Sequence, residues 1–502
     1  MPENPQTDIG CVLTPLEWAC WAVERYQLVD KWLGGATILE PTAGRGAFLE
    51  AIIHLALKRG CTITDEALRR LFAVELKSDS REYFFKHLKS KYGIEFPPGN
   101  FVVGDFLLGD GFPVADYVIG NPPWTNFSDL PDDYKEKLKP VFHHYGLVSR
   151  GASTLLGGSR VDLAALVIAK AISECLQPNG KAYIYMPLSI LLNDGAHDNF
   201  RSYCVNGIDF AVGEIHDQTA VGVFKGIGTR YCFCTFERDK QAQYPVPFHE
   251  YTVDGTVTEK TAFPAYGGSS PLLVASLDEK VPPPPVIKVA RASYPRQGVN
   301  TCGANDVFIF DSYELIDDAL CRLSNKLRKD IILPRDMVYP LLGKKQFVDP
   351  DAPPERYIFI PHDRITGKPL TEDLLRENEA TWSYLESVRE KLVNRRGTMI
   401  NSKIKKGILW ALLGVGEYSF APYKIAWQAY GVKDFSPILF EGLWQANNAL
   451  QAYMPFNDRD DAMRVLNELT NSSIEKYLTM HLTGSTCNWA QPGRIKKFLS
   501  ES

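Results

Sequence analysis

Short apolar runs alternate with amphipathic helical patterns through the first 240 residues, and this alternation restricts the fold more than any other feature of the chain. Strands that alternate with helices predict a mostly parallel sheet covered by helices on both faces. In such a sheet ligands bind beyond the carboxyl ends of the strands, so polar residues that follow a strand are the candidate site residues. Seven runs are predicted strands: 36–40, 71–76, 101–103, 116–119, 181–186, 210–215 and 230–236.

The remainder of the chain differs in character. Residues 241–290 contain Gly267-Gly268-Ser269-Ser270 and a proline run from Pro282 to Pro285, which cannot continue a helix or a central strand. We therefore expect an α/β domain over 1–240, a connector over 241–290 with room for a hairpin of its own, and a second domain of mixed pattern over 291–502. A length of 502 residues fits this division, because domains average roughly 100–200 residues.

Charge is distributed unevenly. Residues 1–280 carry 26 basic and 34 acidic side chains, whereas residues 281–502 carry 29 and 26. A polyanionic partner would therefore meet the second half of the chain, although an ordinary solvated face explains the same charges equally well. The richest stretch, 388–424, holds eight basic residues: Arg389, Lys391, Arg395, Arg396, Lys403, Lys405, Lys406 and Lys424.

Composition excludes several classes of protein. Hydrophobic residues make up 45% and charged residues 23% of the chain, which rules out a disordered or collagen-like protein. The chain has neither a continuous apolar run of about 18 residues nor a signal-peptide core, so we expect no membrane partner. The ten cysteines include no Cys-x2-Cys pair and the nine histidines show no ligand spacing. We therefore expect a cytoplasmic protein with reduced thiols and no bound metal.

A glycine-rich turn follows the first predicted strand, in the sequence Leu-Glu-Pro-Thr-Ala-Gly-Arg-Gly-Ala-Phe over residues 39–48. Glu40 ends the strand, and Gly44 and Gly46 allow the backbone to approach a ligand closely. The third glycine of a dinucleotide loop is absent because Leu49 stands there. A tight turn between a strand and a helix explains the motif equally simply.

Two further acidic residues end predicted strands. Glu75 ends the second, where a carboxylate can accept hydrogen bonds from two ribose hydroxyls. Asp105 and Phe106 follow the third, where they could accept a hydrogen bond from an exocyclic amine and pack on a purine face. Without the other motifs, Glu75 is typical of a surface carboxylate, and Asp105 and Phe106 are typical of an ordinary loop after a strand.

The sequence Asn121-Pro122-Pro123-Trp124, after the fourth predicted strand, is the most specific motif. Its two prolines fix the backbone and remove two N–H donors, which leaves the Asn121 side-chain oxygen and the Pro122 carbonyl as acceptors. Two acceptors suit a planar amine that donates two hydrogen bonds. Trp124 adds an aromatic face on which a planar substrate can stack.

In this order the motifs resemble those of the gamma-class DNA adenine-N6 methyltransferases, beginning with Thr14-Pro15. The resemblance implies a Rossmann-like methyltransferase domain with a mostly parallel seven-stranded sheet and a C-terminal α+β target-recognition domain. Residues 298–308 resemble the start of that recognition region, and residues 420–427 resemble a segment of longer relatives linked to restriction or phage defence. Residues 223–226 resemble the family's phenylalanine loop, although a plain hairpin is an alternative.

The resemblance also implies the cofactor, the substrate and the residues that bind them. S-adenosylmethionine would donate a methyl group to an adenine flipped out of double-stranded DNA, and a restriction or defence protein would be a further partner. Asn121 and Pro122 would accept the adenine amino group, which Trp124 and Phe224 would enclose between their rings. The implied cofactor-binding residues are Thr14, Glu40, Ala43, Gly44, Gly46, Glu75, Asp105, Phe106 and Asn121.

Other interpretations share part of this pattern. Adenine in RNA and a protein glutamine amide present a similar planar amine, and so does N4 of cytosine. A bifunctional restriction enzyme would need clustered carboxylates and a lysine for magnesium, and the stretch 131–137 has these residue types crowded into one short loop. A DNA-binding subunit of a larger defence complex is a further alternative.

Overall fold

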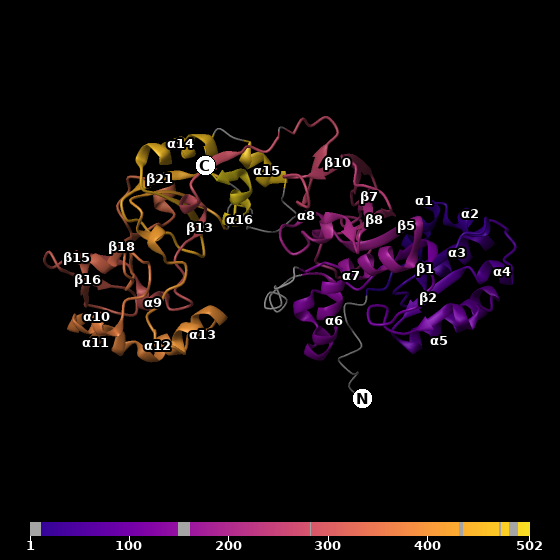
Figure 1. The fold of residues 1–502 in the computed structure, drawn as a ribbon, viewed down its shortest axis with the longest axis horizontal. Helices are drawn as coiled ribbons and strands as arrows, with labels where there is room; N and C mark the ends of the chain where they lie inside the picture. Colours follow the sequence, from indigo (N-terminus) through magenta and orange to yellow (C-terminus); the bar gives the residue numbers. More distant parts are fainter. Residues whose placement is uncertain are drawn as a thin grey trace. The chain divides into compact units, whose positions relative to one another are not determined.

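The computed structural model describes residues 12–148, 161–281, 283–430, 435–470, 473–480 and 490–501 (Figure 1). Of the residues considered above, Cys11, Pro282 and Cys487 lie outside these ranges. The chain divides into two compact units, Met1–Val281 and Pro282–Ser502. Among the described helices, none combines the length and the apolar character that crossing a bilayer requires.

A large sheet forms the centre of the first unit, and all seven predicted strands belong to it. Its first five strands lie in the order β3-β2-β1-β4-β5 and are parallel to one another. β8 then runs antiparallel between β5 and β7. The strands are β1 (Ile38–Glu40), β2 (Leu71–Glu75), β3 (Phe101–Val103), β4 (Ala115–Gly120), β5 (Leu176–Pro187), β7 (Ile208–Asp217) and β8 (Tyr231–Arg238).

Four further strands bring this sheet to eleven. The stretch assigned above to a connector contains β9 (Val246–Tyr251), β10 (Val257–Pro264) and β11 (Leu272–Ser276), which continue the sheet beyond β7. Val246 and Phe248 are buried while Pro247 is exposed, the alternation of a strand with one covered face. The short strand β6 (Cys204–Val205) pairs with β7.

Helices cover both faces of the sheet, so successive residues of a strand enter opposite cores. Ile38 and Ala73 pack in the core that includes residues of α1, α3 and α5. Leu39 and Val74 pack in the core that includes residues of α6 and α7. The helices are α1 (Leu16–Arg25), α2 (Leu28–Leu33), α3 (Ala47–Lys58), α4 (Asp65–Leu68), α5 (Ser78–Tyr92), α6 (Asp132–His144), α7 (Leu163–Lys170) and α8 (Ser189–Leu192).

The second unit has several small sheets in place of one large sheet. Its strand orders are β13-β22-β20-β21, β14-β19-β18 and β15-β16-β17, all antiparallel, together with the parallel pair β12-β23. The strands are β12 (Ile287–Val289), β13 (Arg296–Gln297), β14 (Ile309–Phe310), β15 (Ser312–Leu315), β16 (Leu320–Ser324), β17 (Ile331–Pro334), β18 (Val338–Leu341), β19 (Arg356–Phe359), β20 (Tyr423–Gln428), β21 (Ile438–Glu441), β22 (Gln451–Phe456) and β23 (Leu499–Glu501).

Short helices accompany these sheets, and the predicted α+β character of the second unit is confirmed. They are α9 (Asn305–Phe308), α10 (Glu372–Arg376), α11 (Glu379–Ser387), α12 (Arg389–Val393), α13 (Thr398–Ile404), α14 (Arg459–Thr470), α15 (Ile474–Met480) and α16 (Pro492–Ile495).

Candidate active site

A cavity of about 260 Å³ lies at the carboxyl ends of β1, β2 and β4. Parallel strands bring their carboxyl ends to one edge of a sheet, which is why motifs far apart in the sequence meet here. Most of the predicted cofactor-binding residues line the cavity: Thr14, Glu40, Ala43, Gly44, Glu75, Asp105, Phe106 and Asn121. Gly46 does not line it.

The glycine-rich turn needs both of its glycines, for different reasons. Gly44 and Gly46 have φ angles of +53° and +72°, which side chains rarely adopt. The backbone N–H of Gly44 donates to Glu75 Oε2 over 2.7 Å, which fixes the turn against the end of β2. A Cβ atom on Gly46 would lie 2.4 Å from the ring of Phe84. Gly46 therefore allows α5 to pack closely against the turn.

Glu40 is held beneath the start of α3. Its side chain is 2% exposed, and its two oxygens accept the backbone N–H groups of Phe48 (3.5 Å) and Leu49 (3.2 Å). Burial raises the pKa of Glu40 to about 8, although the two backbone hydrogen bonds act in the opposite direction. The carboxyl group therefore has a fixed position in the wall of the cavity.

The other two acidic residues are also oriented by the protein. Glu75 accepts the Lys77 backbone N–H over 3.0 Å in addition to that of Gly44. Asp105 accepts the Tyr134 hydroxyl over 2.9 Å and the Leu107 backbone N–H over 2.8 Å. Each carboxylate oxygen has more than one acceptor site, so both side chains retain capacity for a ligand.

Two residues at this site were missed by the sequence analysis. Tyr134, from α6, lines the cavity and orients Asp105. Lys170, from α7, is buried, and its ammonium group donates to the Gly109 carbonyl over 2.5 Å. This bond ties the loop that carries Asp105 and Phe106 to α7. Lys170 belongs to no motif, and Tyr134 lies in the stretch 131–137, which was considered above only for its carboxylates and lysines; the fold alone brings both residues to the loop.

Asn121 has the most informative hydrogen bonds in the site. Its amide nitrogen donates to the Val12 carbonyl over 2.9 Å and to the Thr14 hydroxyl over 3.2 Å. Its oxygen, Oδ1, is buried and has no partner among the described residues. Two acceptors thus fix the orientation of the amide and leave one free, buried acceptor.

The two aromatic side chains expected on either face of a base are in contact with each other. The ring centroids of Trp124 and Phe224 lie 4.9 Å apart at an interplanar angle of 84°. Tyr231 packs against both rings. A base sandwiched between two rings needs about 7 Å between their planes, so this arrangement has no space for one.

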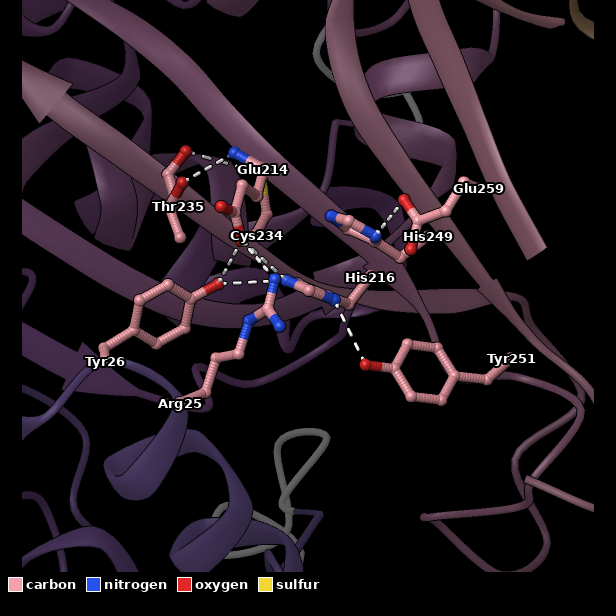
Figure 2. Close-up of polar contacts among 9 residues, drawn as sticks. All are labelled: Arg25, Tyr26, Glu214, His216, Cys234, Thr235, His249, Tyr251 and Glu259. Atoms are coloured by element: carbon pink, nitrogen blue, oxygen red, sulfur yellow. Dashed lines mark hydrogen bonds and ion pairs between the residues drawn. The ribbon is translucent and has the colours of Figure 1, made fainter. Parts of the chain in front are cut away.

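A second cluster of titratable residues lies away from the cavity, between α1 and the extended sheet (Figure 2). Arg25 and Tyr26 approach Glu214 of β7 within 3.1 and 3.4 Å, and the imidazole of His216 lies 3.2 Å from the same carboxylate. The His216 and His249 rings stack at 4.4 Å and 12°, and His249 pairs with Glu259 over 2.7 Å.

This cluster brings together possible metal ligands whose spacing along the chain gave no sign of it. We expected no metal ligands, yet folding brings the ligand atoms of Glu214, His216 and His249 within 4.8 Å of one another. The His216 and His249 rings are stacked in parallel, so the lone pairs of their ring nitrogens point along parallel planes and do not converge on one metal ion. The Glu214 carboxylate is already paired with the Arg25 guanidinium. We therefore interpret the cluster as the contact that attaches α1 to the extended sheet.

The Rossmann-like sheet and the polar groups at its strand ends define the chain as an α/β protein with a methyltransferase fold. Comparison with known proteins confirms the resemblance to restriction-modification methyltransferases. The chain is similar to the Type II methyltransferase M.NspV of Nostoc sp., with 23% identity over 446 residues that cover 84% of this chain and 82% of the relative. No family model matches the chain.

Solved structures share the fold over nearly the whole chain. The DrdV–DNA complex matches 99% of this chain and 57% of its own, with a TM-score of 0.52 and 12% identity. The Type IIL restriction-modification enzyme MmeI in complex with DNA matches 90% and 62%, with a TM-score of 0.50 and 12% identity. The chain thus spans less than two thirds of each solved chain.

Proposed function

We propose that the protein is a site-specific DNA methyltransferase that transfers a methyl group from S-adenosylmethionine to N6 of adenine. The Oδ1 of Asn121 carries the proposal, because a buried acceptor with no partner in the described part of the chain suits a ligand that donates a hydrogen bond there. M.NspV is a Type II methyltransferase, and the structures of MmeI and DrdV are complexes with DNA. Both facts favour DNA as the substrate.

The cavity has the chemistry that S-adenosylmethionine requires. Glu75 would accept the ribose hydroxyls, while Asp105 and Phe106 would contact the adenine of the cofactor. Glu40, Thr14 and Ala43 would surround its methionine end. The bound cofactor would supply a methyl group on a sulfonium, which is a good leaving group.

In the proposed transfer, adenine N6 would gain the methyl group as the cofactor's sulfonium lost it. Adenine N6 is a weak nucleophile because its lone pair is conjugated with the ring. Acceptance of both amino hydrogens, by Asn121 Oδ1 and the Pro122 carbonyl, would favour a pyramidal nitrogen with an available lone pair. One proton then leaves the methylated nitrogen to solvent. Catalysis would thus consist mainly of positioning, without a general base.

Base entry requires the loop between β7 and β8 to move. Phe224 lies in this loop, packed against Trp124. Within the loop, Gly222 and Gly226 flank Phe224 and have φ angles of +70° and +78°, conformations typical of glycine. We propose that the loop pivots at these glycines, so that Phe224 separates from Trp124 and the flipped base enters between their rings.

The second unit would hold the DNA backbone, with fewer basic residues than the sequence suggested. Lys424 and Arg395 are buried and cannot reach phosphates. Lys391 and Arg389 pair with Asp306 and Glu386. Three exposed cations of the stretch 388–424 have no acidic partner among the described residues. They are Arg396, Lys405 and Lys406, which lie on either side of α13. These three are the candidates for phosphate contacts.

The product of the reaction tests the proposal. Purified protein is incubated with labelled S-adenosylmethionine and mixed unmethylated DNA, and the digested nucleosides are identified by mass. We expect N6-methyladenine from the wild type and none from Asn121→Ala. Asn121→Asp is the matched variant, because it keeps an acceptor oxygen but no longer donates to Val12 and Thr14.

Other results would redirect the assignment. N4-methylcytosine would transfer the same mechanism to cytosine. Cofactor binding without label in DNA would contradict the proposal and favour RNA, a protein amide or a subunit that needs a partner, and each of these can be supplied in the same assay.

A further inference from the structure

A polar pocket in the second unit has no role in the function proposed above. It has a volume of about 210 Å³ and lies between the segments 299–305 and 447–449. The two segments are joined by backbone hydrogen bonds from Val299 to Ala446 (2.7 Å) and from Asn448 to Val299 (3.2 Å). We call it the asparagine pocket, because four of its lining residues are Asn300, Asn305, Asn447 and Asn448.

The oxygens of three of these amides are already used. Asn300 Oδ1 accepts the Cys302 backbone N–H over 2.8 Å, and Asn447 Oδ1 accepts that of Ala449 over 2.9 Å. A backbone N–H can only donate, so it identifies the side-chain atom as the oxygen in both cases. Asn305 Oδ1 accepts the Thr301 hydroxyl over 2.5 Å.

The amide nitrogens are left as donors. Those of Asn300, Asn305 and Asn447 have no partner among the described residues, and neither an acidic nor a basic side chain lines the pocket. Its floor is apolar, formed by residues that are at most 8% exposed: Val299, Ile309, Leu341 and Ile358. Residues that line the asparagine pocket therefore carry N–H groups available to a ligand that can accept hydrogen bonds.

A buried positive charge lies next to one wall of the asparagine pocket. The Arg395 guanidinium is 5% exposed and donates to the carbonyls of Thr301 (3.4 Å) and Ala411 (2.8 Å). It has no acidic partner among the described residues, so its charge is not neutralised locally. A positive charge behind the loop 299–305 strengthens the preference for an acceptor or an anion.

We infer that the asparagine pocket binds hydrogen-bond acceptor atoms of a DNA nucleotide, an inference that rests on the proposed function. These atoms are either the non-bridging oxygens of a phosphate or the O6 and N7 of guanine. An asparagine that reads adenine donates to N7 and accepts from N6. Asn300 and Asn447 cannot do this, because their oxygens are already bound within the protein.

Asn300→Asp and Asn447→Asp test the inference in the full chain. Each keeps the oxygen that accepts the internal N–H and replaces the free NH2 group by a charged acceptor. We expect each to raise the Kd for a mixed pool of 30-base-pair duplexes about tenfold or more in fluorescence anisotropy, with S-adenosylmethionine affinity unchanged. Asn467→Asp, which makes the same charge change on the exposed face of α14, should change Kd less than about twofold.

Folding and the source of the acceptor are tested in parallel. Asn305→Ala removes an exposed amide, so it reports on the pocket even if a buried variant fails to fold. The source is read from the difference in Kd between the wild type and Asn300→Asp: its loss on methylphosphonate duplexes would identify phosphate oxygens, and its loss on 7-deazaguanine duplexes would identify guanine. Wild-type affinity in both aspartate variants and in Asn305→Ala would overturn the inference alone. A wild type that binds no DNA would overturn the proposed function and this inference with it.

Discussion

The two units differ in how their polar side chains relate to the sequence. In the first unit, motifs far apart in the chain meet at one edge of a sheet, and Asn121 has a buried acceptor there that none of the described residues occupies. In the second unit, the basic residues of the stretch 388–424 do not share one surface. Lys424 is 0% exposed, whereas Lys405 and Lys406 lie at the surface. Position at a strand end therefore predicted which side chains lie together better than local charge did.

The strongest test of this contrast concerns Asn121 in the first unit. We expect Asn121→Ala to lower the rate of methyl transfer by about 100-fold or more, because removal of one preorganised polar contact to a reacting group costs about that much. Cofactor affinity, measured by calorimetry, should change far less. A proportionate loss of cofactor affinity would instead assign Asn121 to cofactor binding.

The second test divides the basic stretch by burial. Replacing Arg396, Lys405 and Lys406 by alanine should weaken DNA binding about 10- to 100-fold at moderate salt. It should also reduce the slope of log K against log salt by about 2.7, since each lost phosphate contact accounts for about 0.9. Lys424→Met is the matched control.

Lys424 donates to the Ala421 carbonyl in the interior, and burial lowers its pKa to about 7. Its replacement by methionine should leave the salt slope unchanged, because the ammonium group cannot reach DNA. An equal fall of the slope in Lys424→Met would show that the buried charge acts on DNA through the protein.

The third test compares two glycines of the first unit. Gly46→Ala combines a positive φ angle with a 2.4 Å approach to Phe84, whereas Gly60→Ala has φ +76° and no atom within 4 Å. We expect Gly60→Ala to cost about 1 kcal/mol of unfolding free energy and Gly46→Ala about 2–4 kcal/mol. Urea unfolding measures both. Equal losses would mean that Phe84 moves aside freely.

The smallest expected effect concerns the contact between α1 and the extended sheet. The hydrogen bond with His216 and the Arg25 ion pair lower the pKa of Glu214 to about 2, and burial lowers the pKa of His216. Both groups take up protons at a higher pH in the unfolded chain than in the folded one. Their contribution to stability is therefore present at neutral pH and is lost as the pH falls from about 6.5 toward 2.

Urea unfolding between pH 7 and 4 measures this loss. Glu214→Gln should flatten the dependence, and Glu17→Gln, on the exposed side of α1, should leave it as in the wild type. Glu40 has a raised pKa and acts in the opposite direction, but it is common to all three proteins and cancels in the comparison. An unchanged slope in Glu214→Gln would show that the cluster contributes nothing to folding.

The sequence predicted the strand-end residues because parallel strands impose a common edge on them. It could not predict contacts made between elements, such as Tyr134 with Asp105 or Lys170 with Gly109, since neither partner marks the other in the chain. Over 241–290 the sequence predicted a connector with at most a hairpin, where the structure has the strands β9 to β11. Pro245, Pro247 and the glycines of the turns between these strands obscure the strand pattern. The place of the three strands in the sheet is set by the pairing of β9 with β7, of β10 with β9 and of β11 with β10.

The segment 12–14 contacts both the Asn121 amide and the cavity assigned to the cofactor. Val12 and Thr14 hold the Asn121 amide, and both line the cavity assigned to the cofactor, together with Leu13 above Gly44. A ligand that orders this segment also orders the amide, and a substrate that engages the amide favours the ordered segment. In the proposed function, a ligand in the cavity and a substrate at the amide would both contact this segment, and any coupling between them would strengthen the binding of each by the same factor.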